Sequence, residues 1–267
     1  VPVQYPIATG PDFNAVIEKA DLHALNINKE DSISEISSRI YVNLTGFDLD
    51  ELEGEVRIDS TVYRDSRGNY YMDEFTASIV NDNLMERRIN MNSDFFDFEM
   101  AGKMNFSKML PVFKEYVDHY VHITLWEKEL ADFEKYKQNN DVEQDFFLNL
   151  TLKDTKTLSR LFMPSLKIAK NTSLKGTFTS RTHALNFTLR SNHVQIGDMN
   201  LNDIELKNSN FFRSTMTNLS FKDVSYTKIN PTDTLSLGVE NLSFITRMAN
   251  DTGFGRLAWD DELEENH

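Results

Sequence analysis

The chain alternates apolar and polar residues over most of its length. The alternation is clearest in five short segments: 40–44, 54–58, 148–152, 185–189 and 235–239. A period of two places the apolar side chains on one face of a β-strand and the polar side chains on the other. The pattern therefore predicts a long sheet with one apolar face, which either packs within the fold or is offered to another molecule.

The period becomes helical at Phe106. From there to about residue 138, apolar residues recur with the 3.6-residue spacing of an α-helix, and Ser107 is a candidate N-cap. This segment predicts one long helix or a helical pair. A second, short helix is expected over Lys156–Phe162, where Pro164 stops it.

Strand patterns flank the helical segment, over about 33–103 and 146–247. The expected fold is mainly β: an extended, bent antiparallel sheet that forms a groove, with the helix or helical pair inserted near the middle. The predicted division is an N-terminal β-groove segment (1–105), a helical insertion (106–145) and a C-terminal β-groove segment (146–267). A weak internal repeat, in which 43–52 aligns with 149–158, favours repeated strand units over a closed barrel.

Composition narrows the functional classes. The 267-residue chain carries 42 acidic and 28 basic residues, a formal net charge of −14. Nucleic acid attracts clustered Lys and Arg, so no nucleic-acid partner is expected. The chain has no cysteine, which excludes disulfides, thiol catalysis and cysteine-bound zinc. No run of about 18 apolar residues is present, so we expect no membrane-spanning helix. The start at Val1, without Met, is interpreted as that of an internal piece of a longer protein.

Motifs with catalytic or metal-binding chemistry are weak. Glu115, His119 and His122 share one side of the expected helix, a geometry that metals use, but an ordinary exposed face explains them better. The acidic positions 48–50 and 139–145 resemble calcium loops only loosely, because both lack the glycine and terminal glutamate of the EF-hand pattern. Eight N-x-S/T sequons occur in a chain that is rich in Asn and Thr, and we attribute them to that composition. No catalytic residue, metal or cofactor is therefore predicted.

Three segments resemble the TamB/AsmA-like family, in the form found in Bacteroidetes-type bacteria. They are LTGFDLDELEGEVRI at Leu44–Ile58, NSDFFDFEMAGKMNF at Asn92–Phe106 and LTLKDTKTLSRLFMPSLKIAKNTSLKGTF at Leu150–Phe178. The resemblance implies a bent, taco-shaped sheet with an apolar groove, within a periplasmic parent protein anchored to the inner membrane. It also implies phospholipid transfer between the two membranes, support of outer-membrane protein assembly, and an outer-membrane barrel partner that meets parts of the parent outside this chain.

We expect the inward apolar positions of the alternating strands to line such a groove and to contact phospholipid acyl chains. A role in ordinary core packing is the simpler interpretation for any single one of them. The candidates are Ile40, Val42, Leu44, Val56, Ile58, Leu148, Leu150, Leu152, Phe187 and Leu189.

Two other functional classes stay open. A secreted or surface carbohydrate-binding or adhesion β-module would use exposed aromatic side chains on a polar sheet face, and the candidates are Tyr63, Tyr70 and Tyr71. A glycoside-active enzyme would need two carboxylates several ångströms apart, and Asp94, Asp97 and Glu99 offer such pairs. Because a chain with 42 acidic residues produces such pairs by chance, the expected function is non-enzymatic.

Overall fold

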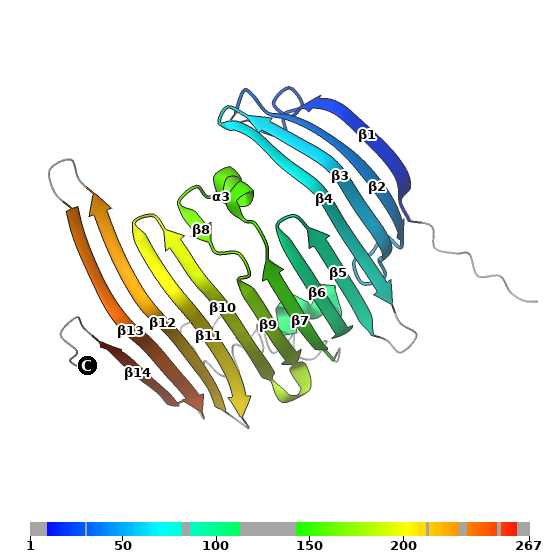
Figure 1. Ribbon diagram of the computed structural model, residues 1–267. Coiled ribbons are helices and arrows are strands. Elements are labelled where there is room, and N and C mark those ends of the chain that lie inside the picture. Colours follow the sequence, from blue (N-terminus) through cyan, green and yellow to red (C-terminus); the bar gives the residue numbers. More distant parts are fainter. Residues whose placement is uncertain are drawn as a thin grey trace, which may run out of the picture. The chain divides into compact units, whose positions relative to one another are not determined.

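The protein folds as an open antiparallel sheet. The computed structural model describes residues 10–29, 31–81, 86–112, 143–211, 214–229, 234–249 and 252–260. The described strands form a fourteen-stranded sheet in the order β1 to β7 and then β9 to β14, with β8 paired to β10 (Figure 1). The prediction of a mainly β, antiparallel fold is confirmed. The chain divides into two compact units, Val1–Met100 and Ala101–His267, each of which is described by itself below.

The first unit is a run of hairpin-connected strands. They are β1 (Asp12–Asp21), β2 (Glu35–Thr45), β3 (Glu53–Asp65), β4 (Gly68–Asn81), β5 (Arg87–Ser93) and β6 (Phe96–Lys103), the last of which crosses the division between the units. Strand patterns were expected only from about residue 33, so β1 was missed. Its apolar residues Phe13, Ala15 and Ile17 do alternate, but Ala, Glu and Lys have low strand propensity.

The second unit contains β7 (Asp145–Leu152), β8 (Leu166–Ile168), β9 (Ser173–Thr179), β10 (Ala184–Ile196), β11 (Met199–Phe211), β12 (Ser214–Ile229), β13 (Thr234–Ala249) and β14 (Thr252–Asp260). Helix α3 (Lys156–Phe162) has the predicted bounds, and a 3₁₀ turn, η1, covers Ser180–Thr182. The strands were predicted to end near residue 247, so β14 was missed. Gly253 and Gly255 weaken the strand signal of its sequence.

The predicted middle helix does begin at Phe106 and is described as far as Val112; the rest of that prediction, with Glu115, His119 and His122, lies outside the described residues. Its N-cap is Asn105 rather than Ser107, because the Asn105 side-chain oxygen accepts a hydrogen bond from the Lys108 N–H at 3.0 Å. The fully buried Gln144 side chain accepts from the Asn105 N–H at 3.0 Å and donates to the Asn105 carbonyl at 3.1 Å.

Val112 fastens this helix to the sheet of the second unit. It forms a buried cluster with Phe178 of β9, against which Phe146 of β7 and Leu185 of β10 also pack. The rings of Phe146 and Phe178 lie 5.6 Å apart between centroids. The helix therefore rests on the face of the sheet to which these residues point.

Three strand residues other than glycine have left-handed backbone angles: Ser60 (φ 53°), Asp203 (φ 48°) and Asn241 (φ 50°). The register shifts beside Ser60 in the β2–β3 pair and beside Asn241 in the β13–β14 pair. Such bulges bend a strand and increase its local twist. They are a physical source of the strand curvature that Figure 1 shows within each unit.

The predicted internal repeat has a structural counterpart. Asp48, after β2, and Asp154, after β7, occupy matching positions of the repeat. The Asp48 carboxylate accepts a hydrogen bond from the Asp50 N–H at 2.8 Å, and the Asp154 carboxylate accepts one from the Lys156 N–H at 3.1 Å. In both copies, therefore, an aspartate closes the turn that follows the strand.

Candidate functional site

An uncharged ladder of apolar side chains crosses seven strands of the second unit. Residues that pair directly across an antiparallel sheet point to the same face. The pairing joins, strand by strand, Leu150, Leu174, Leu189, Leu206, Leu219, Phe244 and Leu257. We call this row the leucine ladder. The first five are partly buried, whereas Phe244 and Leu257 are 43% and 54% exposed.

The neighbouring row on the same face is also uncharged but partly polar. It runs through Leu148, Gly176, Phe187, Asn208, Thr217 and Thr246. Asn208 is buried, and its side-chain oxygen accepts hydrogen bonds from Thr215 at 3.1 Å and Thr217 at 2.7 Å. Because its amide also donates to the Leu185 carbonyl, this polar interruption is satisfied internally.

The first unit has two apolar rows of its own. One joins Phe13, Val42, Val56, Ala77 and Met91, and the next joins Ala15, Ile40, Ile58 and Phe75. Val42 is buried, whereas Phe13 at the sheet edge is about half exposed. The apolar face is thus continuous across β1 to β5.

The ten predicted lining residues fall into two sets, each on a single face. Ile40, Val42 and Leu44 of β2 pair with Ile58, Val56 and Gly54 of β3, so the five candidates of the first unit lie together. In the second unit, Leu148 and Phe187 lie on either side of Gly176, and Leu150 and Leu189 lie on either side of Leu174. Leu152 follows on the same face of β7 by alternation.

An open groove of about 670 Å³ lies on the second unit. Its lining includes Met216 and Asn218 but not Thr217 between them, so it opens on the face opposite the leucine ladder. Of the ten predicted lining residues, only Leu148 and Phe187 contribute to it. The other lining residues are Phe147, Asn149, Lys175, Gly176, Thr177, Asn186, Thr188, Lys207, Asn208 and Ser209.

The groove face carries a local excess of positive charge. Three consecutive cross-strand rows there bear five basic side chains and one acidic one: Lys175, Arg190, Lys207, Arg247 and Arg256 against Glu205. Glu205 accepts from Arg190 at 2.7 Å and pairs with Lys207 at 2.6 Å, and the hydrogen bonds from Lys207 and then Arg190 lower its pKa. On the face of the first unit opposite its own apolar rows, three cross-strand rows are acidic instead. They carry Asp12, Glu55, Asp59 and Glu74 against Arg39 and Arg57.

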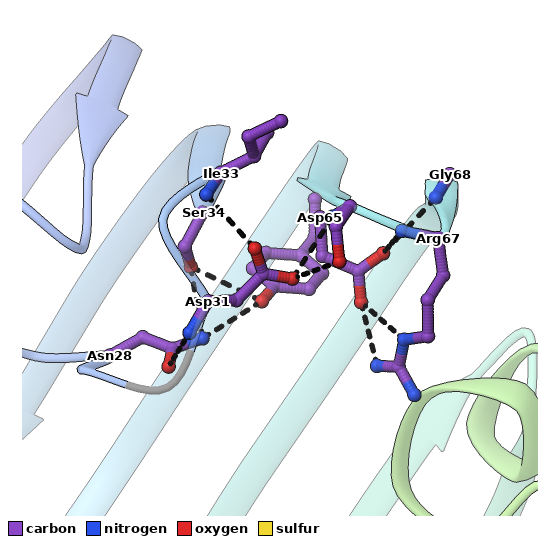
Figure 2. Close-up of polar contacts among 9 residues, drawn as sticks. Asn28, Asp31, Ile33, Ser34, Asp65, Arg67 and Gly68 are labelled. Atoms are coloured by element: carbon purple, nitrogen blue, oxygen red, sulfur yellow. Dashed lines mark hydrogen bonds and ion pairs between the residues drawn. The ribbon is translucent and has the colours of Figure 1, made fainter.

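A polar cluster in the first unit fastens the loop before β2 to the β3–β4 hairpin (Figure 2). The Asn28 amide donates to Ser34 at 3.2 Å and to the Tyr63 hydroxyl at 3.3 Å. Asp31 accepts from the Ser66 hydroxyl at 2.7 Å and from the Ser66 N–H at 3.0 Å. These bonds, with the Ser66 hydroxyl as the largest cause, lower the pKa of Asp31.

Asp65 closes the same hairpin. Its side chain is only 1% exposed and lies 2.6 Å from the Arg67 guanidinium. Burial alone would raise the pKa of Asp65, but the hydrogen bonds and charge of Arg67 outweigh burial, and the pKa is lowered. The Arg67 and Gly68 N–H groups also donate to this carboxylate, at 2.8 and 3.1 Å. The cluster therefore has a structural role, because its carboxylates already accept hydrogen bonds from groups of the same chain.

The residues that suggested other functions have structural partners. Tyr70 is buried against Tyr63, with ring centroids 5.9 Å apart, and of the three tyrosines only Tyr71 is exposed. Asp97 accepts a hydrogen bond from the Asn92 amide, and Glu99 lies 3.6 Å from Arg88.

Neither a metal site nor a membrane-spanning helix is found where the chain is described. No group of three or more His, Asp or Glu side chains in those ranges could hold a metal ion. Among the same residues, no helix combines the length and apolar character needed to cross a bilayer.

Sequence reasoning missed five ladder residues and the basic side chains of the groove. Leu174, Leu206 and Leu219 each stand between polar neighbours, so strand alternation could have found them. Phe244 is followed by Ile245 and Leu257 by Ala258, so the alternation is weaker at these two positions. Lys175 and Lys207 could not have been found in this way, because only the register of three strands brings them into one row.

Comparisons with known proteins give no relative from which a function could be transferred. No protein-family model, no curated protein and no solved structure matches this chain.

Proposed function

We propose that this chain is a non-enzymatic segment of a periplasm-spanning envelope protein that offers an apolar sheet face to phospholipid acyl chains. The observation that carries the proposal is the leucine ladder, an uncharged row across seven strands whose last two members are about half exposed. A bound acyl chain would lie across the strands, along the ladder, with its headgroup in water.

The dimensions of the ladder suit an acyl chain. Seven strands about 4.8 Å apart give a row roughly 29 Å long. The hydrocarbon core of a bilayer is about 30 Å thick and holds two chain lengths, so one chain would occupy about half of the ladder. Each methylene that leaves water contributes about 0.8 kcal/mol, so a modest number of contacts suffices for binding without a specific pocket.

The wider role follows from the resemblance of three segments to the TamB/AsmA-like family. We include in the proposal a periplasmic location, a parent protein anchored to the inner membrane, and transfer of phospholipid between inner and outer membranes. Support of outer-membrane protein assembly, through a barrel partner of the parent, belongs to the same proposal.

Native mass spectrometry of the chain purified from a bacterial lysate tests lipid binding. Phe244→Asp and Leu257→Asp place charge at the exposed end of the ladder, where folding is least at risk. Ser243→Asp and Ala258→Asp are matched controls, because these two residues pair with each other on the opposite face. Co-purified phospholipid that is lost only in the ladder variants supports the proposal. A lipid-free mass for the parent chain after incubation with phospholipid would contradict it.

A further inference from the structure

The groove opposite the leucine ladder has the chemistry of a binding site of its own. It offers two apolar surfaces, the ring of Phe147 (40% exposed) and the thioether of Met216 (47% exposed). Between them, the lining also carries hydroxyl, carboxamide and ammonium groups. Such a mixture suits a polar ligand with one or two flat apolar faces.

Charge indicates the sign of the ligand. The whole chain carries −14, yet three neighbouring cross-strand rows on the groove face, two of which line the groove, bear five basic side chains and one acidic one. The charged residues of the lining itself are Lys175 and Lys207. Lys207 is paired with Glu205, whereas Lys175 has no ion-pair partner among the described residues. An anionic group on Lys175 would meet a charge that no described acid already neutralises.

Hydrogen-bonding groups indicate the rest of the ligand. Asn149 and Asn218 are among the lining residues of the groove, and their side-chain oxygens are buried without a donor among the described residues. A buried acceptor without a donor is costly, so a rotation of either side chain toward a ligand hydroxyl would be favourable. Thr188 and Asn186 provide further donors and acceptors beside them.

We propose that this groove binds an anionic oligosaccharide, a sugar chain that carries carboxylate or sulfate groups. Its anionic group would lie on Lys175, its hydroxyls on the asparagine and threonine side chains, and one sugar ring on Phe147. An acyl chain would cover Lys175 and the hydroxyl and carboxamide groups of the lining without supplying hydrogen-bond partners for them, whereas an anionic sugar chain supplies such partners. The site is separate from the ladder and does not depend on the lipid proposal.

Isothermal titration calorimetry with the whole chain tests this site. The probes are hexagalacturonate and a heparin hexasaccharide, with neutral maltohexaose as the uncharged comparison. We expect both anionic probes to bind more tightly than maltohexaose. Lys175→Gln should weaken them roughly tenfold, the loss expected for one hydrogen bond to a charged group. Phe147→Ala should weaken all three probes, because it removes the ring platform.

Two controls separate the site from general charge and from the ladder. Lys19→Gln makes the same charge change on an exposed lysine of β1 in the first unit and should leave binding unchanged. Phe244→Asp should also leave it unchanged. The proposal is overturned if neither anionic probe binds, or if Lys175→Gln and Lys19→Gln weaken binding equally. Binding of phosphatidylglycerol vesicles that depends on Lys175, with no oligosaccharide binding, would also overturn it and would assign the groove to lipid headgroups.

Discussion

Phe178 is the position at which one substitution tests how the helix that begins at Phe106 is held. The Phe178 side chain is 5% exposed and packs against Val112 of that helix and Phe146 of β7. Truncation of a buried phenylalanine to alanine costs about 3–5 kcal/mol of unfolding free energy, through lost burial and the cavity that remains. Phe178→Ala should therefore destabilise the second unit by this amount, and Phe178→Leu by about 1 kcal/mol, because most of the volume is kept.

Urea unfolding followed by tryptophan fluorescence measures the effect. Trp259 belongs to the second unit. With a denaturant dependence of about 2–3 kcal/mol per molar urea, the midpoint should fall by roughly 1–2 M. Phe147→Ala is the control, since this neighbouring phenylalanine is 40% exposed on the other face and should cost far less. A loss below about 1 kcal/mol for Phe178→Ala, or an equal loss for Phe147→Ala, would refute the reasoning.

Three further predictions concern the first unit. Arg87 is buried and donates to two carbonyls of the loop before β3, so Arg87→Met should cost about 1–3 kcal/mol and speed hydrogen exchange in that loop. Arg88→Met, at an exposed neighbour, should do neither; equal effects would contradict the assignment. Gly54 has φ +129°, and a Cβ there would lie 2.1 Å from a backbone oxygen, so Gly54→Ala should lower the thermal midpoint sharply, whereas Gly253→Ala, in open space, should not. The pKa of Asp65 is lowered in the folded state, so its contribution is present above the unfolded value of about 3.9 and is lost as the pH falls through the folded value. Asp65→Asn should flatten the acid limb of stability measured by urea unfolding from pH 7 to 2, and an unchanged limb would contradict this.

The sequence predicted those parts of the fold that depend on local patterning. Alternation located β2, β3, β7 and β10, and helix α3 was predicted with its bounds because Pro164 ends it. Strand β14 was missed because Gly253 and Gly255 carry no strand preference, and its place follows only from pairing with β13. The local sequence pattern indicates the face of the strand on which a side chain lies. Which strands lie next to each other depends on tertiary structure, and the local pattern does not predict it.

The candidate sites show the same limit. Leu150 and Leu189 were recognised as apolar strand positions, but that Leu174 joins them into a ladder depends on the register of β7, β9 and β10. Asn208 would have been assigned to the solvent from its polarity, yet it is buried on the apolar face, where Thr215 and Thr217 satisfy it. The basic character of the groove face could not be predicted from composition, because the net charge of the whole chain is negative.

The central proposal is that the ladder face, and not its reverse, contacts acyl chains. Site-specific photo-crosslinking compares the two faces directly, with a benzophenone side chain placed at Leu219 on the ladder or at Ser220 on the opposite face. After irradiation with phosphatidylethanolamine and phosphatidylglycerol, we expect phospholipid adducts at position 219 and few or none at position 220. Equal adducts at the two positions, or none at position 219 in a folded protein, would contradict it.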